Sequence, residues 1–266
     1  MVTAMSYRTI EFRTDKNIAV LYFNRPDQLN SFNNEMHAEI RDALTTKIDF
    51  GVHRCLLLSG KGRAFCAGQD LNERKFDADN PPDLGESLEN NYNPLINIIT
   101  SLELPVVCAV NGLAAGAGVG IALACDIVLA SSTAEFIFSF AKVGLGLDSA
   151  SSWSLPRLIG LPRARAMTML GERLTAERAE EWGMIWKCYN DEKLMDEALS
   201  MAHYLSQQPT RGLAIIKQEL KASTSNTLEQ QLALEVKLQK IAGVTEDYRE
   251  GVLAFFEKRK PVFKGK

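Results

Sequence analysis

Runs of apolar, strand-forming residues separated by short polar turns dominate the first half of the chain. Residues 9–14 and 18–24 lie on either side of such a turn, so we expect a β-hairpin. Apolar residues recur every four positions within residues 33–44, which predicts a helix. Residues 54–60 and 105–112 are short apolar runs that end in glycine and predict buried strands.

The same pattern continues through the middle of the chain. Residues 113–126 begin with small residues and become apolar, which predicts a helix, and residues 127–131 and 134–138 predict two more strands. Alternating strands and helices favour a sheet of parallel strands covered by helices. Residues 77–94 are polar and contain prolines, so we expect a mobile lid or a loop without fixed structure there.

From about residue 162 the pattern is almost wholly helical. Residues 175–183 carry a threonine at the start and a glycine at the end, as a capped helix does. Residues 227–243 predict a further helix with a broad apolar face, which needs a surface to pack against in its own chain or in a neighbour. That face comprises Leu228, Leu232, Leu234, Val236, Leu238 and Ile241.

Composition excludes several classes of protein. Hydrophobic residues make up 46% and charged residues 24% of the 266 residues, which is typical of a globular protein. The net charge of −3 provides no positive surface for nucleic acid, so any anionic ligand must be held by a local site. Residues 1–16 lack an apolar signal region and no apolar run is long enough to span a membrane, so we expect a cytoplasmic protein with no membrane partner.

The scattered cysteines and histidines argue against metal and thiol chemistry. The chain has five cysteines and three histidines, with no C-x-x-C pair and no two histidines close in sequence. Neither a disulfide framework, nor a metal site, nor a histidine base is therefore expected.

Two glycine-rich segments bring backbone donors within reach of a ligand. Residues 111–121, NGLAAGAGVGI, follow a strand and open a helix, where a dinucleotide fold would hold pyrophosphate, but the spacing G-x-G-x-G does not match that fingerprint. Packing through small residues is the simpler alternative. Residues 60–72, GKGRAFCAGQDLN, form a second such turn. Together the two turns suggest paired N–H donors of the kind that stabilise a developing oxyanion.

The order of these motifs resembles the crotonase, or enoyl-CoA hydratase/isomerase, superfamily over nearly the whole chain. The motifs are NRPDQLNSF, GRAFCAGQDL, AVNGLAAGAGVGIALACDI, the loop around Asp148 and the closing EGVLAFFEKRKPVFKGK. The resemblance implies an α/β crotonase fold, with repeated ββα units forming a parallel-sheet spiral core. It also implies a core with the acyl-CoA site over residues 1–199 and an α-helical trimerisation and CoA-covering region over residues 200–266.

The resemblance also implies the chemistry of the site. In the family, two backbone N–H groups clasp the thioester oxygen, and the matching residues here are Gln69 and Ala117. Family hydratases use two glutamates to add water, but Gly120 and Phe140 stand at those positions, which argues against hydration as the main activity. Asp148 stands where family isomerases place a single aspartate, which suits removal and return of one proton.

Asp148 has other interpretations. Apolar neighbours would raise its pKa and strengthen it as a base; they are Phe138, Phe140, Val143, Leu145 and Leu147. Aspartate is also a common helix cap, and a helix beginning near Ser149 would account for it. The string DSASSWSL further resembles 4-chlorobenzoyl-CoA dehalogenase, in which the matching aspartate is a nucleophile. The serines nearby lack a G-x-S-x-G elbow and are interpreted as turn and capping residues.

The resemblance implies no metal or redox cofactor, and coenzyme A enters only as part of the substrate. Arg25 and Lys258 are expected near its phosphates on chemical grounds as well, with solvated surface charge as the alternative for each. In the family, a neighbouring subunit supplies the residues that match Phe255 and Lys258. The expected substrate contacts are Arg25, Gln28, Leu29, Ala67, Asp70, Leu71, Gly116, Phe140, Leu145, Phe255 and Lys258.

Within the superfamily the motifs are most similar to those of the ring 1,2-epoxyphenylacetyl-CoA isomerases of phenylacetate degradation. The resemblance implies conversion of the ring epoxide to the oxepin thioester, with a Δ3 to Δ2 enoyl shift as a second activity. A dehalogenase, a general enoyl-CoA isomerase, and a weakly catalytic acyl-CoA-binding subunit that docks a partner enoyl-CoA hydratase remain alternatives. We expect a homo-oligomer, either a trimer or a dimer of trimers.

Overall fold

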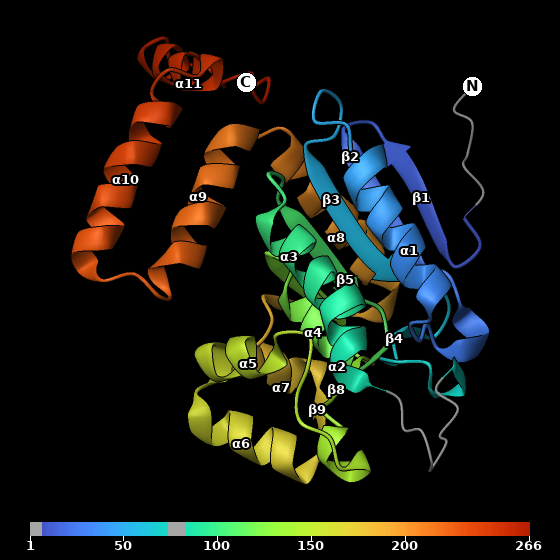
Figure 1. The fold of residues 1–266 in the computed structure, drawn as a ribbon. Helices are drawn as coiled ribbons and strands as arrows, with labels where there is room; N and C mark the ends of the chain where they lie inside the picture. Colours follow the sequence, from blue (N-terminus) through green and yellow to red (C-terminus); the bar gives the residue numbers. More distant parts are fainter. Residues whose placement is uncertain (1–6, 74–82) are drawn as a thin grey trace.

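The computed structural model describes residues 7–73 and 83–266, and its strands form two sheets (Figure 1). The larger sheet has the order β1-β2-β3-β5-β7-β10 and the smaller one β4-β6-β8-β9. The pairs β1–β2 and β8–β9 are antiparallel, and every other pairing in the two sheets is parallel. The strands of the larger sheet are β1 (Ile10–Asp15), β2 (Ile18–Phe23), β3 (Cys55–Gly60), β5 (Val106–Val110), β7 (Ile127–Ser131) and β10 (Lys187–Tyr189). Those of the smaller sheet are β4 (Ala64–Cys66), β6 (Leu113–Ala115), β8 (Glu135–Ile137) and β9 (Arg173–Thr175).

From β3 to β8, consecutive strands alternate between the two sheets. The chain passes from β3 to β4, from β5 to β6 and from β7 to β8, and helices follow each of these pairs. This alternation confirms the predicted spiral of ββα units. The predicted hairpin is also confirmed, with Ile10 opposite Phe23.

Helices cover the sheets and extend beyond them (Figure 1). The α-helices are α1 (Asn34–Asp42), α2 (Leu84–Ser87), α3 (Asn93–Ser101), α4 (Ala117–Leu123), α5 (Ser151–Ile159), α6 (Leu161–Leu170), α7 (Ala176–Glu181), α8 (Asp191–Ser206), α9 (Thr210–Ser223), α10 (Leu228–Ala242) and α11 (Glu246–Phe256). Shorter helical turns are η1 (Pro26–Gln28), η2 (Ala43–Lys47), η3 (Leu71–Glu73), η4 (Leu88–Tyr92) and η5 (Phe140–Val143). The predicted caps are confirmed, because Asn33 accepts from the Met36 amide and Thr175 from the Arg178 amide.

The structure corrects three expectations from the sequence. Residues 84–94 are helical instead of structureless, with Asp83 capping α2 through the Glu86 amide and Tyr92 buried; residues 77–82 lie outside the described residues. The stretch 113–126 contains the short strand β6 before its helix. The C-terminal half contains the strands β9 and β10, which complete the edges of the two sheets.

Helix α8 passes through the position chosen as the boundary between core and helical region. Its buried residues Leu194, Ala198 and Ala202 pack on the larger sheet, so residues on both sides of position 199 belong to one packed layer. The chain leaves that layer only after α8. Helices α9 and α10 then lie against each other beside the sheets, and α11 follows near the C-terminus (Figure 1).

Two sets of hydrogen bonds join the helical region to the part of the chain that contains the sheets. Lys217 of α9 donates hydrogen bonds to Asp126 Oδ2 and to the Ile99 carbonyl, both at 2.9 Å. Arg54 donates to Thr210 Oγ1 at 3.0 Å and to the Phe263 carbonyl at 2.8 Å. The predicted apolar face of α10 stays largely open in the single chain, since only Leu238 among its six residues is buried. Among the described residues no helix has the length and apolar character needed to span a membrane.

Candidate active site

The turn after β4 presents the backbone around Gln69. Gly68 adopts φ +88°, a left-handed conformation that favours glycine, and its amide donates to the Cys66 sulfur at 3.3 Å. The Phe32 amide donates to the Gly68 carbonyl at 2.7 Å, and the Asp70 amide donates to the Phe32 carbonyl at 2.9 Å. The peptide units on either side of Gln69 are therefore held against the segment that contains Phe32.

The second glycine-rich turn places Ala117 at the start of α4. Gly116 precedes it with φ +53°, again in the region that favours glycine. Because Ala117 is the first residue of α4, its amide points out of the helix end, where no preceding turn supplies a carbonyl acceptor. The positive end of the helix dipole adds to the attraction that this amide exerts on a negative oxygen.

The two turns touch each other. A Cβ built on Gly68 would lie 2.9 Å from the Ala115 carbonyl oxygen and 3.5 Å from the Ala117 nitrogen. A Cβ on Gly118 would lie 2.4 Å from the Cys66 carbonyl oxygen. Any side chain at either glycine would push the turns apart, so glycine at both positions is what lets the Gln69 and Ala117 backbones approach.

Asp148 lies just before α5, and α5 packs against α4. It is half-buried with a buried Oδ1, and the following residues Ser149 and Ala150 both adopt left-handed backbones, with φ 49° and 58°. The N-cap of α5 is Ala150, which makes no side-chain capping bond, and the Ser151 amide bonds to the Asp148 carbonyl at 2.8 Å. Asp148 therefore does not occupy the cap position of the helix that follows it.

Gly120 joins the Asp148 loop to α4. A Cβ on Gly120 would lie 2.4 Å from the Ser149 carbonyl oxygen and 2.9 Å from Ser151 Oγ. The first turns of α4 thus contact the Gln69 turn through Gly118 and the Asp148 loop through Gly120. Contact this close leaves no room for a carboxylate side chain at position 120.

Aromatic side chains fill the other position where family hydratases carry a glutamate. Phe140 is buried and stacks on Phe138, with ring centroids 6.5 Å apart. The Phe140 ring also lies 3.6 Å from the position of a Cβ on Gly116. Val143 and Leu145, by contrast, are exposed in the single chain, so they do not form the apolar surroundings of Asp148 expected of them.

Arg25 and Asp70 form an ion pair that joins the 25–31 segment to the Gln69 turn. The Arg25 guanidinium donates to Asp70 Oδ2 at 2.8 Å and also to the Ser31 carbonyl. Burial alone would raise the pKa of Asp70, but the hydrogen bonds from Arg25 and Asn72 outweigh it and hold that pKa below its usual value. In this position Arg25 holds the site together, and a role at a CoA phosphate stays a prediction.

Asn30 is a residue that the sequence analysis missed. It is fully buried with φ 57°, accepts from the Arg25 amide at 2.8 Å, and donates to the Lys61 and Ala64 carbonyls. It fastens the 25–31 segment to β4. The only sequence signal was an asparagine within a polar turn, the residue type that best tolerates a left-handed backbone after glycine.

The remaining predicted contacts are distributed between two regions. The Leu29 carbonyl accepts a hydrogen bond from the Ala67 amide at 2.9 Å, so the two proposed CoA-contacting loops lie together, with Gln28 and Leu71 exposed beside them. Phe255 and Lys258 are exposed on α11 and just after it. Figure 1 shows α11 well separated from α4 and α5, so a single chain does not bring this pair to the site.

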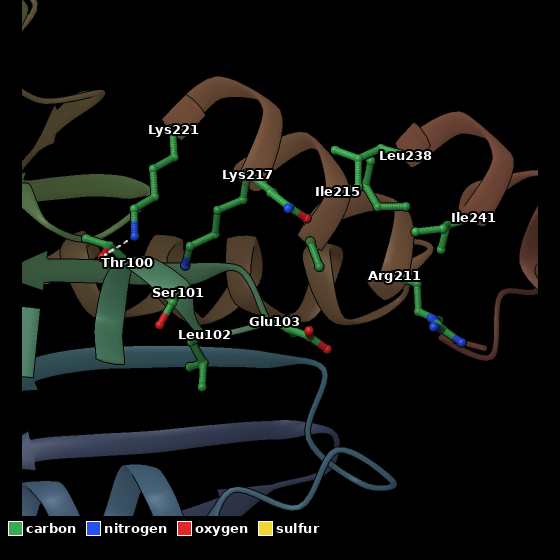
Figure 2. Close-up of a pocket in the computed structure, with 12 residues that line it drawn as sticks. Thr100, Ser101, Leu102, Glu103, Arg211, Ile215, Lys217, Lys221, Leu238 and Ile241 are labelled. Carbon is green, nitrogen blue, oxygen red and sulfur yellow. Dashed lines mark hydrogen bonds between the residues drawn. The ribbon is translucent and has the colours of Figure 1, made fainter. Parts of the chain in front are cut away.

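A cavity of about 450 Å³ lies between the end of α3 and helices α9 and α10 (Figure 2). Its lining includes Glu103, Arg211 and Leu238, and Lys221 donates a hydrogen bond across it to Thr100 Oγ1 at 3.0 Å. No predicted site residue lines it. Within residues 7–73 and 83–266, no group of three His, Cys, Asp or Glu residues is arranged to hold a metal.

The chain is similar to known proteins over nearly its whole length. The sequence model of the family described as enoyl-CoA hydratase/isomerase matches residues 13–266. The chain is 51% identical to the 1,2-epoxyphenylacetyl-CoA isomerase of Escherichia coli (strain K12), over 95% of the chain and 97% of that protein. It is 34% identical to the trans-2-decenoyl-acyl-carrier-protein isomerase of Streptococcus mutans, over 98% of the chain and 100% of that protein. The crystal structure of enoyl-CoA hydratase subunit I from Geobacillus kaustophilus HTA426 superposes with a TM-score of 0.90 at 33% identity, covering 98% of this chain and 99% of that one.

Proposed function

Because the chain belongs to the enoyl-CoA hydratase/isomerase family, we propose that it isomerises acyl-CoA thioesters through an enolate. The amides of Gln69 and Ala117 bind the thioester oxygen, and Asp148 moves the proton. The observation that carries this proposal is the contact of the Gly68 backbone with Ala115 and Ala117, which brings the two donor turns together. Two preorganised donors lower the barrier to enolate formation by several kcal/mol, about 3 kcal/mol for each.

A single carboxylate suffices for such an isomerisation. Asp148 removes a proton from the carbon next to the thioester, and the electron pair moves onto the thioester oxygen between the two amides. The protonated Asp148 then returns the proton at another carbon as the enolate collapses. No atom is gained or lost, so the second acid that hydration needs has no role here. The close contact of Gly120 with Ser149 supports this division, because it excludes a carboxylate at that position.

For the substrate, we propose the ring epoxide of phenylacetyl-CoA, converted to the oxepin thioester, with Δ3 to Δ2 enoyl shift as a second activity. The printed activity of the Escherichia coli relative, at 51% identity over most of both chains, supports this choice. Both reactions use a proton next to a thioester carbonyl. A dehalogenase would use Asp148 as a nucleophile, and a binding subunit would not need its carboxylate at all.

Proton exchange tests the mechanism directly. A 3-enoyl-CoA is incubated with the protein in deuterated water, and double-bond migration and deuterium incorporation are followed by NMR. We expect both with the wild type and a loss of at least a hundredfold with Asp148→Asn. Asp196→Asn is the matched control, because it makes the same change at an exposed position on α8.

The outcomes separate the alternatives. Full exchange by Asp148→Asn would refute the proposed role of the carboxylate. No exchange by the wild type, followed by chloride release from 4-chlorobenzoyl-CoA, would assign the dehalogenase reaction instead. Neither exchange nor chloride release, with retained acyl-CoA binding, would favour the binding subunit. The proposed substrate is tested by incubating 1,2-epoxyphenylacetyl-CoA with the wild type and quantifying both the remaining substrate and the product by chromatography.

We also propose that the active protein is a homo-oligomer, either a trimer or a dimer of trimers. Phe255 and Lys258 would then reach the CoA of a neighbouring subunit. The exposed apolar face of α10 and the separation of α11 from the catalytic turns support this arrangement.

A further inference from the structure

The Gln69 side chain is fixed at both ends of its amide. Its Oε1 accepts a hydrogen bond from the Tyr92 hydroxyl at 3.0 Å. Its Nε2 donates to the Phe32 carbonyl at 3.0 Å and to the Asp70 carbonyl at 3.3 Å. A primary amide held through both its oxygen and its nitrogen cannot rotate without breaking one of these bonds.

The side chain and the backbone of this turn share an anchor. The Phe32 carbonyl accepts from Gln69 Nε2 and also from the Asp70 amide, and the Phe32 amide donates to the Gly68 carbonyl. Hydrogen bonds thus hold Gln69 through its side chain and through the peptide units on both sides of it. The direction of its backbone N–H depends on all of these bonds. Among these hydrogen bonds, the one from the Tyr92 hydroxyl comes from outside both the segment that contains Phe32 and the Gln69 turn.

Tyr92 is rigidly placed. It is fully buried at the end of the π-helical turn η4, where the chain continues into α3. Its ring meets the His37 ring edge-on at 4.5 Å between centroids, and the Phe32 ring lies 6.0 Å away. A phenol packed between rings at the start of a helix keeps its hydroxyl in one place, as a support for a functional group requires.

We propose that Tyr92 is a positioning residue that, through the Gln69 side chain, orients the backbone N–H of Gln69 toward the thioester oxygen. This inference rests on the proposed function, because it requires the Gln69 N–H to be an oxyanion donor. Tyr92 acts through Gln69 and does not itself exchange a proton with the substrate. Preorganised donors act by being aligned before the charge develops, so a small loss of alignment lowers the rate of the chemical step more than it weakens substrate binding.

The test compares Tyr92→Phe with Tyr7→Phe. Tyr7 also donates its hydroxyl to one side chain, Asp42 at 2.6 Å, but it lies away from the catalytic turns and serves as the control. We expect Tyr92→Phe to lower kcat about five- to tenfold with KM changed less than twofold, the loss typical of one hydrogen bond. Tyr7→Phe should leave both parameters unchanged.

A spectroscopic readout distinguishes positioning from general destabilisation. A thioester labelled with ¹³C at the carbonyl, such as cinnamoyl-CoA, is bound and its C=O stretch is recorded by difference infrared spectroscopy. We expect binding to the wild type to lower the frequency, and binding to Tyr92→Phe to lower it clearly less at saturating ligand. If the wild type itself gives no shift, the proposed function fails and the role of Tyr92 fails with it, whereas equal shifts in the wild type and in Tyr92→Phe overturn the role of Tyr92 alone.

A second variant keeps the inference testable if Tyr92→Phe folds poorly. Gln69→Met retains the backbone N–H donor and removes the side-chain amide. This variant should reproduce the loss of kcat and of the carbonyl shift. The double variant should then be no worse than Gln69→Met alone. A wild-type kcat and carbonyl shift in Tyr92→Phe, or additive losses in the double variant, would overturn the proposal.

Discussion

At the scale of single residues, the loop after Asp148 bends through two non-glycine residues in left-handed conformations, Ser149 and Ala150. Such a backbone costs about 1–2 kcal/mol for a residue with a side chain. Glycine would adopt it freely. The strain lies next to the proposed base, where backbone outliers are often part of how a catalytic group is held.

Relieving this strain should stabilise the protein. We expect Ala150→Gly to raise the free energy of unfolding by about 1 kcal/mol, since Ala150 at φ 58° lies where glycine is favoured. Ala141→Gly, at an exposed position in the helical turn η5, should instead lower it by about 0.5–1 kcal/mol. Urea unfolding of the three proteins at pH 7 measures both changes. A destabilised Ala150→Gly would mean that the loop carries no such strain.

The opposite result is expected at Gly120. A Cβ there would overlap the Ser149 carbonyl oxygen at 2.4 Å, so Gly120→Ala should lower the free energy of unfolding by about 2–3 kcal/mol. At Gly146 an added Cβ meets nothing within 4 Å, and Gly146→Ala should be nearly neutral. Thermal unfolding of the two variants provides the comparison. Equal melting temperatures would contradict the close contact between α4 and the Asp148 loop.

At the scale of elements, the strands of five or six residues could be predicted, whereas among the three-residue strands only β8 was predicted. β3 and β5 are continuous apolar runs bounded by turns, which is a strong strand signal. β9 and β10 have three residues each, of which only Leu174 is buried, so too few positions remain to establish a period. Their pairing is decided by neighbouring strands that arrive from distant parts of the chain. Helix α2 and the helical turn η4 were not predicted. The surrounding prolines and polar residues outweighed the helical signal of Leu88 and Tyr92, which are four residues apart.

The same distinction holds for the candidate site. Features that depend on neighbouring residues could be predicted, and contacts between distant segments could not. The glycines that bring the donor turns together are visible as a motif, and their backbone role could be predicted. The Arg25–Asp70 pair and the Tyr92–Gln69 bond join residues far apart in sequence, and nothing local in either segment signals them. The Asp70 carboxylate is engaged with Arg25, and its expected contact with the substrate stays a prediction.

This pair predicts a pH dependence for the contact between the 25–31 segment and the Gln69 turn. The folded-state pKa of Asp70 lies below 3.8, so the pair contributes stability above pH 3.8 and loses it as the pH falls through the folded value. We expect Asp70→Asn to lower the free energy of unfolding by about 3 kcal/mol at pH 7, because it leaves the Arg25 charge buried without its counter-ion. The difference from the wild type should shrink as the pH falls below 3.8 and through the lower folded-state pKa, where the carboxyl of the folded wild type becomes protonated as well.

Urea unfolding at pH 7 and near pH 3 checks this prediction. Asp27→Asn is the control, because Asp27 is exposed in the same segment. A constant difference between Asp70→Asn and the wild type at both pH values would show that the ionised pair is not the source of the stability.

At the scale of the whole molecule, the chain contains two regions that differ in how completely a single chain buries their apolar side chains. The sheets and α8 bury their apolar faces within one chain, whereas α9 to α11 leave many large apolar side chains exposed. The sequence predicted the apolar face of α10 but could not tell which surface covers it, because periodicity is the same for a face buried within a chain or between chains.

The last prediction concerns that face. Leu228, Leu232 and Val236 follow one another at four-residue spacing on α10 and are all exposed, so they form a stripe that an adjoining subunit would cover. A charge in the middle of a buried apolar contact is costly because it must be desolvated without a partner. We therefore expect Leu232→Glu to shift the protein from trimers or hexamers to monomers in sedimentation velocity, while its far-ultraviolet circular dichroism stays unchanged.

Ala233→Glu is the matched control, since it adds the same charge to α10 about 100° away from Leu232 around the helix. It should leave the assembly intact. If a neighbouring subunit supplies Phe255 and Lys258 to the CoA, Leu232→Glu should also raise KM for acyl-CoA at least tenfold, whereas the intact Gln69 and Ala117 turns keep part of kcat. A wild type that sediments as an active monomer would refute both the trimer and the shared CoA site, and would require α11 to reach the substrate within its own chain.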